Sequence, residues 1–331
     1  MSVMKRPLQF SAMAMAVVIG LACPGLAAQA AAYPEKSVRV IVPFAPGGST
    51  DIVARIVTQR MSDELGQTFV VDNKSGAGGA IGAQQAARAE PDGYTLSIAT
   101  VSTLAVIPAC RPEGLGYDPM KDFLPVTNFA NVPNVVEVNP SFPAKTFKEF
   151  VQVLKDNPGK YSYGSSGQCS VLHLFGEAFK MATGTDAVHI PYKGSGPAVS
   201  DAVGGQIEIL FDNLPSSMGQ IEAGRLRPMA IAWPQRLESL KDVPTLAEEG
   251  YPQLNRSAWY GLLAPKGTPP EIIAVLHKAA VAALNDPQVV AALQKQGAVP
   301  SGNTPEEFAR EIKAEHDWAR DVVAKGNIEL K

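Results

Sequence analysis

The stretch SVRVIVPFAPGGSTDIVARIV, residues 37–57, decides the fold. Residues 37–44 are mostly β-branched and apolar, so they predict a buried strand. A Pro-Gly-Gly turn follows. Residues 50–65 then place apolar side chains at helical spacing before Gly66, a typical helix stop. A strand, a glycine-rich loop and a helix in this order are the repeating unit of an α/β fold.

The same alternation continues along the chain. Residues 68–71 and 94–99 predict strands, with a helix of small residues over 78–89 between them. This β-α-β-α-β order requires parallel strands joined by right-handed crossovers. A proline-rich segment over 108–119 interrupts the alternation, and two extended runs then flank Val132-Pro133.

A second α/β block follows, and the chain ends in a mainly helical part. The block predicts helices over 146–154, 171–181 and 197–203, and strands over 161–163, 188–191, 207–211 and 226–232. One late helix is expected near Pro269-Pro270, and another at Thr304, where Glu307 completes a capping box. Two similar α/β lobes predict a ligand cleft between them, lined by strand-to-helix loops.

Composition excludes several classes of protein. The 331 residues carry 29 Lys and Arg against 32 Asp and Glu, so no basic surface for nucleic acid is expected. A hydrophobic content of 46% with 18% charged residues excludes disorder. Three cysteines are too few for a disulfide framework, and the four histidines lack metal-ligand spacing. We therefore expect no metal and no cofactor.

Residues 1–32 predict a signal peptide that is removed on export. Lys5 and Arg6 precede an apolar stretch over 8–21, and small residues around Ala30 offer a cleavage site. A membrane anchor is the alternative, but this stretch is shorter than the roughly 20 residues that span a bilayer. Cys23 suggests a lipoprotein site, which the following Pro24 weakens. We expect a mature, exported chain without an anchor.

The loop after the first strand is built to bind an anion. Its glycines let the backbone approach a ligand closely, and its hydroxyl residues open a helix whose free N–H groups and dipole favour negative charge. A capped turn without a ligand is the alternative. Asp51 would repel an anion, so it either caps backbone groups on the flank or meets a ligand amine. The candidate ligand-binding residues here are Phe44, Ala45, Gly47, Gly48, Ser49, Thr50 and Asp51.

Two further loops have the same character. One lies over 164–170, between a predicted strand and a predicted helix, and the other over 192–197 contains the one cation of the three loops, Lys193. A solvated surface lysine is the alternative for Lys193, and a buried helix residue is the alternative for His173. Together the three loops predict a clamp for a small anion, held mostly by neutral donors. Its further candidate residues are Ser165, Ser166, Gly167, Gln168, Ser170, His173, Tyr192 and Lys193.

Sequence motifs of enzymes are absent. The segment from Gly164 fails the G-x-S-x-G pattern of hydrolases because position 168 is Gln, and no phosphate-binding P-loop occurs. Cys169 is better explained as a small residue in a turn than as a nucleophile. In an oxidising compartment Cys110 and Cys169 are candidates for a disulfide, but the sequence does not give their distance.

Six stretches of the chain resemble the Bug-type receptors of tripartite tricarboxylate transporters. They include YPEKSVRVIVPFAPGGSTDIVARIV, YDPMKDFLPVT and WYGLLAPKGTP, and together they span nearly the whole chain after the leader. Cys110 and Cys169 depart from the family pattern, which expects a small Gly or Ala at the second position. The stretches are residues 33–57, 71–96, 117–127, 190–213, 242–252 and 259–269.

The resemblance implies a periplasmic, monomeric, two-lobed binding protein of the Venus-flytrap type. It implies no enzymatic activity. The ligand would be a small carboxylate, gripped through the first and second loops and partly through ordered water, and passed to the integral-membrane permease subunits. It also implies a discontinuous first lobe, residues 33–131 plus 255–331, with the second lobe, 132–254, inserted. A ligand sensor that feeds a signalling partner and an exported α/β hydrolase remain as alternatives.

Overall fold

The computed structural model describes residue 1 and residues 33–326, and contains two separate β-sheets. In the six-stranded sheet, β1 pairs in parallel with β2 and with β3, as predicted, whereas β10 runs antiparallel to β3 and β4. The order across this sheet is β11 (Val299–Pro300), β4 (Phe123–Val132), β10 (Ala258–Pro265), β3 (Thr95–Thr100), β1 (Val38–Val42) and β2 (Phe69–Asn73).

The second sheet has five strands. Its β6 runs parallel to β7 and β8, while β5 is antiparallel to β8 and β9. The fold class is therefore α/β, as expected from the sequence, and both sheets also contain antiparallel strands, which the sequence did not predict. The order is β7 (Val188–Pro191), β6 (Ser162–Ser165), β8 (Ile209–Asn213), β5 (Asn134–Val138) and β9 (Arg227–Ala232).

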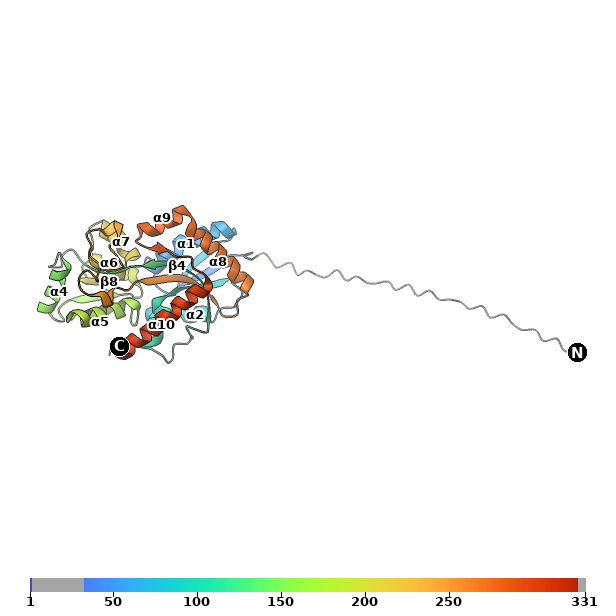
Figure 1. Ribbon diagram of the computed structural model, residues 1–331, viewed down its shortest axis with the longest axis horizontal. Coiled ribbons are helices and arrows are strands. Elements are labelled where there is room, and N and C mark those ends of the chain that lie inside the picture. Colours follow the sequence, from blue (N-terminus) through green and yellow to red (C-terminus); the bar gives the residue numbers. More distant parts are fainter. Residues whose placement is uncertain (2–32, 327–331) are drawn as a thin grey trace. The chain divides into compact units, whose positions relative to one another are not determined.

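Helices accompany each sheet (Figure 1). With the second sheet lie α4 (Phe147–Asp156), α5 (Val171–Thr183), α6 (Ser195–Val203) and α7 (Leu214–Glu222), followed by the short turns η3 (Glu238–Leu240) and η4 (Pro252–Leu254). With the six-stranded sheet lie α1 (Ser49–Leu65), η1 (Ala77–Gly79), α2 (Ala80–Ala87), η2 (Ser102–Val106), α3 (Ile107–Cys110), α8 (Pro270–Asn285), α9 (Pro287–Lys295) and α10 (Pro305–Gly326).

Each sheet has its own hydrophobic core. The apolar residues of β1 and β3, including Val40 and Ile98, are buried in the first core. The second core is rich in aromatic rings, among which Phe179 packs against Phe150 and Phe211. The chain passes between the sheets at Pro133, where β4 ends and β5 begins, and again between β9 and β10. These two crossings bring the loops of both sheets together.

Most predicted elements are confirmed, and two predictions are corrected. The capping box at Thr304 forms as expected, with reciprocal hydrogen bonds to Glu307 of 2.9 and 3.2 Å. The helix predicted over 78–89 is divided into η1 and α2, because Gly78 and Gly79 adopt positive φ values. The sequence analysis missed α7, whose Pro215 and Gly219 weaken the helical pattern.

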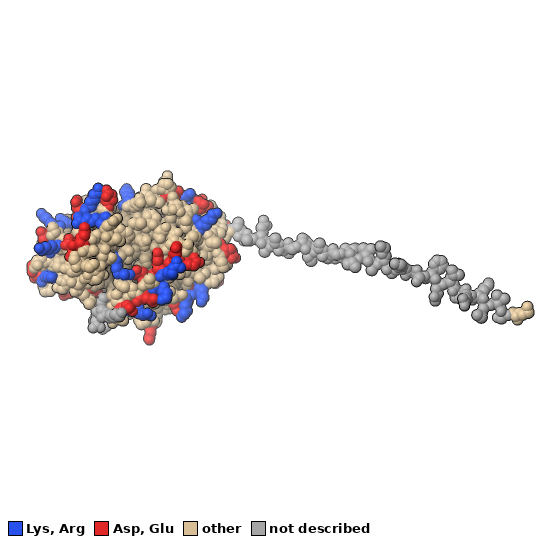
Figure 2. Space-filling model, in the orientation of Figure 1, with Lys and Arg blue, Asp and Glu red and all other residues tan. Residues whose placement is uncertain are grey.

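Over residues 33–326 no helix has both the length and the apolar character needed to cross a bilayer. Within the same range, no cluster of His, Cys, Asp and Glu is arranged to hold a metal ion. Figure 2 shows acidic and basic side chains interspersed on the viewed face, as their near balance in the sequence implies. The predicted signal peptide lies outside the described residues.

Candidate functional site

Four helices begin at one small cavity. Its lining includes the first residues of α1, α5 and α6, which are Ser49, Val171 and Ser195, and the residue before α7, Asn213. Because the first N–H groups of a helix lack partners within the helix, and the helix dipole is positive there, this convergence favours a negatively charged ligand. The complete lining is uncharged: Phe44, Gly48, Ser49, Thr50, Thr100, Val101, Ser102, Ser166, Val171, Ser195, Asn213, Ala258 and Tyr260.

The first loop turns its one acidic side chain away from this cavity. Asp51 accepts hydrogen bonds from the Gly47 N–H at 3.0 Å and from Asn73 at 3.0 Å, and it pairs with Arg55 at 2.9 Å. Burial opposes ionisation of Asp51, yet the hydrogen bonds from Arg55, Gly47 and Asn73 together hold its pKa below the ordinary value. Asp51 therefore caps the flank of the loop, the first of the two roles predicted for it.

The second loop contributes Ser166 to the cavity and uses its other residues to hold its own shape. Ser165 Oγ lies 2.6 Å from His189 Nε2 and accepts a hydrogen bond from the Gly167 N–H at 3.2 Å. Ser170 caps α5 by accepting the N–H of His173 at 3.2 Å. These hydroxyls are thus engaged inside the loop.

His173 is buried behind the second loop, as in the alternative considered for it. Its Nδ1 accepts the Cys169 N–H at 3.2 Å, and its ring stacks on His189 with the centroids 3.8 Å apart. Burial lowers the pKa of His173 to about 4 and that of His189 to about 3. Both rings are therefore neutral near pH 7 and stabilise the loop without attracting an anion.

The third loop contacts the first loop through backbone. The Ala45 N–H donates to the Lys193 carbonyl oxygen at 3.0 Å, while the Lys193 side chain is exposed. Tyr192 points its hydroxyl to Asp201 at 2.8 Å. Neither of these two side chains lines the cavity.

Hydroxyl groups connect the two sheets beside the cavity. Ser49 Oγ donates to the Asn213 carbonyl oxygen at 2.7 Å and accepts the Ser216 N–H at 2.9 Å. Ser216 Oγ in turn donates to the buried carboxylate of Asp212. The Ser49 hydroxyl therefore joins the first helix to the second sheet at the edge of the site.

A chain of buried amides ties the two crossings together. Asn134, at the first crossing, donates to the Arg256 carbonyl oxygen at 2.7 Å and accepts from Asn213. Asn213 also accepts the hydroxyl proton of Tyr260, on β10, at 2.8 Å. These residues were not predicted from the sequence, because they lie far apart in the chain and their contact depends on sheet topology.

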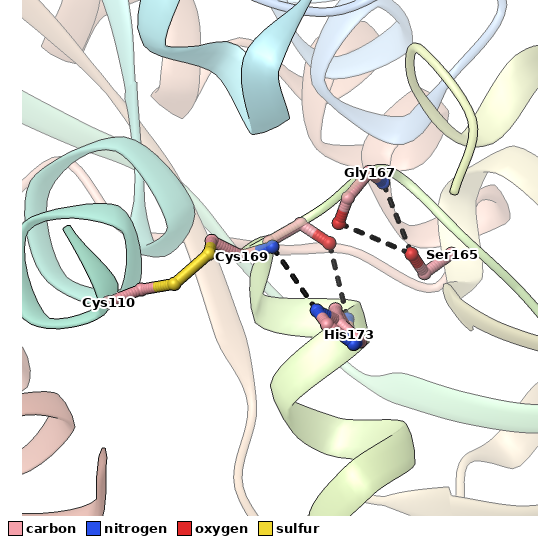
Figure 3. The surroundings of a disulfide bond; sticks show 6 residues. Cys110, Ser165, Gly167, Cys169 and His173 are labelled. Carbon is pink, nitrogen blue, oxygen red and sulfur yellow. Dashed lines mark hydrogen bonds between the residues drawn. A yellow bond between two sulfur atoms is a disulfide. The ribbon is translucent and has the colours of Figure 1, made fainter. Parts of the chain in front are cut away.

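A disulfide joins Cys110, the last residue of α3, to Cys169 of the second loop, with Cα atoms 6.1 Å apart (Figure 3). The pairing considered from the sequence is therefore present. It lies directly beside the hydrogen bonds that Ser165, Gly167 and His173 make within the loop.

The structure brings together only part of the predicted set. Phe44, Gly48, Ser49, Thr50 and Ser166 line the cavity. The other predicted residues are not part of the cavity lining: Ala45, Gly47, Asp51, Ser165, Gly167, Gln168, Ser170, His173, Tyr192 and Lys193.

The sequence analysis did not select several residues that also line the cavity. Thr100 and Ser102 had a usable signal, since hydroxyl residues follow directly on the strand predicted over 94–99. Tyr260 lies within β10 and had none.

Comparison with known proteins agrees with this architecture. A family model described as "Tripartite tricarboxylate transporter family receptor" matches residues 53–328. Protein BugT of Bordetella pertussis is 37% identical over 318 residues, covering 95% of this chain and 98% of BugT. The family model begins within α1, after the cavity-lining residues Phe44 and Gly48 to Thr50, and extends through the second sheet and the C-terminal helices.

Two solved structures extend the likeness to three dimensions. One, described as a periplasmic transporter, is 73% identical with a TM-score of 0.90, covering 90% of this chain and 100% of that one. The other, R. palustris Rpa4515 with adipate, is 37% identical with a TM-score of 0.85, and the match covers 89% of this chain and 98% of that one. The chain belongs to the family of tripartite tricarboxylate transporter receptors.

Proposed function

We propose that this protein is a periplasmic receptor that captures a small carboxylate in the cavity between its two sheets. The observation that carries the proposal is the convergence of α1, α5, α6 and α7 on one uncharged cavity lined by hydroxyl groups. Helix N-termini and hydroxyls supply donors to a carboxylate without a buried cation.

Neutral donors are sufficient for useful affinity. Micromolar binding corresponds to about −8 kcal/mol, and a hydrogen bond to a charged group contributes roughly 1.5–3 kcal/mol. Four to six such donors, about the number available around one carboxylate, leave a surplus after the cost of association. Backbone N–H groups of Ser49 and Thr50 with the hydroxyls of Ser102 and Ser166 are the donors we propose.

The ligand class follows from the cavity and from a relative. R. palustris Rpa4515, whose structure contains adipate, shares the fold at 37% identity. We propose a small di- or tricarboxylate, an acidic amino acid or an aromatic acid for this chain. The residues contacting the part of the ligand beyond the carboxylate decide among these.

The two sheets correspond to the two proposed lobes. We propose that residues 33–131 and 255–331 form the first lobe and 132–254 the second, with the amide chain from Asn134 to Tyr260 at the hinge. The cavity is only about 10 Å³, roughly the space of one water molecule. A dicarboxylate therefore enters only when the lobes part, and the loops close over it afterwards.

A Ser-His pair invites comparison with a hydrolase. Ser165 Oγ and His189 Nε2 are 2.6 Å apart, within reach for proton transfer. The His189 ring stacks on the rings of Tyr163 and His173, however, and burial lowers the pKa of His189 to about 3. A base with so low a pKa activates a hydroxyl poorly near pH 7. We therefore assign the pair to loop structure and propose a receptor without catalytic activity.

Delivery of the ligand to a membrane permease completes the proposal. We propose that a monomer, exported after removal of residues 1–32, passes its ligand to the permease subunits of a tripartite tricarboxylate-type transporter. Genes for a large and a small multi-span membrane protein beside this one would favour transport. A neighbouring histidine kinase would favour sensing.

The test compares the binding of a carboxylic acid with that of the corresponding uncharged amide. We expect adipate, malate, glutamate or nicotinate to raise the melting temperature of the exported protein, because bound ligand adds about 2.7 kcal/mol at one hundred times Kd. The matching amide of each acid, which has nearly the same shape without the charge, is the control. Equal shifts with acid and amide, or no shift with any acid, would contradict the proposal.

A further inference from the structure

The Cys110–Cys169 disulfide connects elements of the two sheets. Cys110 ends α3, which follows β3 of the six-stranded sheet through η2, and packs against the core of that sheet. Cys169 lies in the loop between β6 and α5 of the second sheet. Figure 3 shows the crosslink beside the loop that carries Ser165 and Gly167.

The backbone conformation at Cys169 indicates that the role of this residue is to form the disulfide. Its φ of +58° is left-handed, a conformation that costs most residues roughly 1–2 kcal/mol and costs glycine little. Glycine would therefore adopt this turn at lower cost, and because Cys169 is almost fully buried, its side chain does not contact solvent. What cysteine adds at this position is the crosslink.

The other contacts between the loops of the two sheets are reversible. They include the hydrogen bonds from the Ala45 N–H to the Lys193 carbonyl oxygen at 3.0 Å and from the Val171 N–H to Ser102 Oγ at 3.0 Å. Each of these is replaced by water when the loops separate. A disulfide instead holds its two Cα atoms within about 7 Å.

We propose that the Cys110–Cys169 disulfide is a tether that limits how far the two lobes part. The oxidised protein then opens less often and less widely than the dithiol form, and exchanges its ligand more slowly. The idea of opening lobes rests on the proposed function, but the tether itself is testable without any ligand.

The oxidised and reduced forms of the protein interconvert by thiol–disulfide exchange with an external dithiol. One thiolate of the reductant attacks the sulfur of Cys110, which is the less buried of the two, and the Cys169 sulfur leaves as a thiolate. The second thiol of the reductant then displaces Cys110 and closes its own disulfide. Two electrons thus pass to the protein, and the two protons of the reductant end on Cys110 and Cys169. Exchange with an oxidised protein dithiol of the export compartment reverses the step.

Amide hydrogen exchange of the ligand-free exported protein provides the test. The Ala45 N–H is protected by its hydrogen bond to Lys193 in the third loop, a different segment from either cysteine. We expect this amide to exchange at least about tenfold faster after reduction with dithiothreitol. The amides of Arg39 and Asn139, which donate to Tyr94 and Glu208 on their own side, are the controls and should not change.

A double variant separates the tether from other effects of the reductant. Cys110→Ser with Cys169→Gly should match the reduced protein and should not respond to dithiothreitol, and circular dichroism checks its fold. Equal exchange at Ala45 in oxidised and reduced wild-type protein would overturn the proposal. Equal acceleration at Ala45, Arg39 and Asn139 would also overturn it, because the crosslink would then act only on global unfolding. Neither result depends on whether a carboxylate binds.

Discussion

Glycines of the third loop allow the first and third loops to touch. A Cβ atom at Gly194 would lie 2.8 Å from the Ala45 nitrogen, and one at Gly196 would overlap the Pro46 carbonyl oxygen. Within the second sheet's own elements, Gly196 is the second residue of α6 and needs no special backbone conformation. Its lack of a side chain therefore matters when the loops are together, and little when they are apart.

Gly196→Ala should weaken ligand binding. Alanine favours the α6 helix by roughly 0.5–1 kcal/mol, but its methyl group obstructs contact with Pro46. We expect at least about a tenfold rise in Kd for the adipate probe, or for the acid that the thermal-shift panel selects, measured by titration calorimetry.

Gly47→Ala is the matched control for this substitution. Gly47 has a φ of +78°, but nothing lies within 4 Å of a Cβ atom placed there. Alanine should thus cost about 1 kcal/mol of stability through strain, with little change in Kd. Normal affinity in Gly196→Ala would show that the loops need not touch when ligand is bound.

Lys193→Met tests whether a cation dominates the site. The exposed Lys193 side chain lies outside the cavity lining, and its carbonyl oxygen is the group that contacts the first loop. A solvated lysine contributes little to binding. We expect less than about a twofold change in Kd by calorimetry. A loss of all affinity would instead mean that the lysine turns inward and pairs with the ligand.

At the scale of elements, β5 and β8 hold two carboxyl groups in the interior of the second sheet. Glu137 and Asp212 are fully buried, and Asp212 accepts hydrogen bonds from Ser195 and Ser216. Burial, and for Glu137 also the neighbouring charge of Asp212, raises both pKa values, that of Asp212 to about 6. The folded protein therefore retains protons that the unfolded chain releases above about pH 4.

This pair should contribute less to stability as pH rises. Because Glu137 and Asp212 keep protons in the folded state, their contribution to the free energy of unfolding falls from about pH 4 through their folded pKa values, whereas the lowered pKa values of His173 and His189 act in the opposite direction. Glu137→Gln should reduce that fall by at least about 1.4 kcal/mol, the equivalent of one pKa unit, between pH 5 and pH 8. Urea denaturation measures it. His173 and His189 titrate in the same way in the wild-type protein and the variant, so the difference between the two pH profiles comes from Glu137 and Asp212. Identical pH dependence of the free energy of unfolding in both proteins would contradict the prediction.

Local sequence patterns identified most helices and strands, but they did not show how the two sheets are joined. The apolar run over 37–44 and the capping box at Thr304 depend on neighbours in sequence, and β1 and α10 form where they were expected. Asn213 comes directly before α7, and its side chain contacts Asn134 and Tyr260 instead of capping the helix. No local pattern encodes such contacts, so the amide chain was not predicted from the sequence.

For the whole molecule, ligand binding should change the relation of the two lobes. The cavity of about 10 Å³ is too small for a dicarboxylate, so we expect capture to involve opening of the proposed lobes followed by closure. We expect small-angle scattering to show a larger radius of gyration for the reduced, ligand-free protein than for the same protein saturated with ligand. A matched comparison uses the oxidised protein, in which the difference should shrink. Identical radii for both ligand states of the reduced protein would contradict closure.

The organisation of the whole molecule, like its individual elements, could be predicted only in part from the sequence. The α/β class followed from the alternation of elements, whereas the anion site indicated by three loops that precede helices stays a prediction. Which side chains reach the cavity depends on how the loops fold back: Ser166 lines it, whereas Ser165, its neighbour, turns to His189. Adjacent residues in a glycine-rich loop take opposite directions that the sequence does not specify.

The uncharged lining of the cavity has a consequence for the empty receptor. When a carboxylate leaves a site built around a lysine or arginine, an unpaired charge remains, and solvent must enter to stabilise it. Here the Ser49 hydroxyl donates to the Asn213 carbonyl oxygen and accepts the Ser216 N–H, and Ser102 Oγ accepts the Val171 N–H, so polar groups from the two sides pair with one another. We therefore expect closure without ligand to compete with capture, so that the apparent affinity equals the intrinsic affinity multiplied by the fraction of molecules that are open.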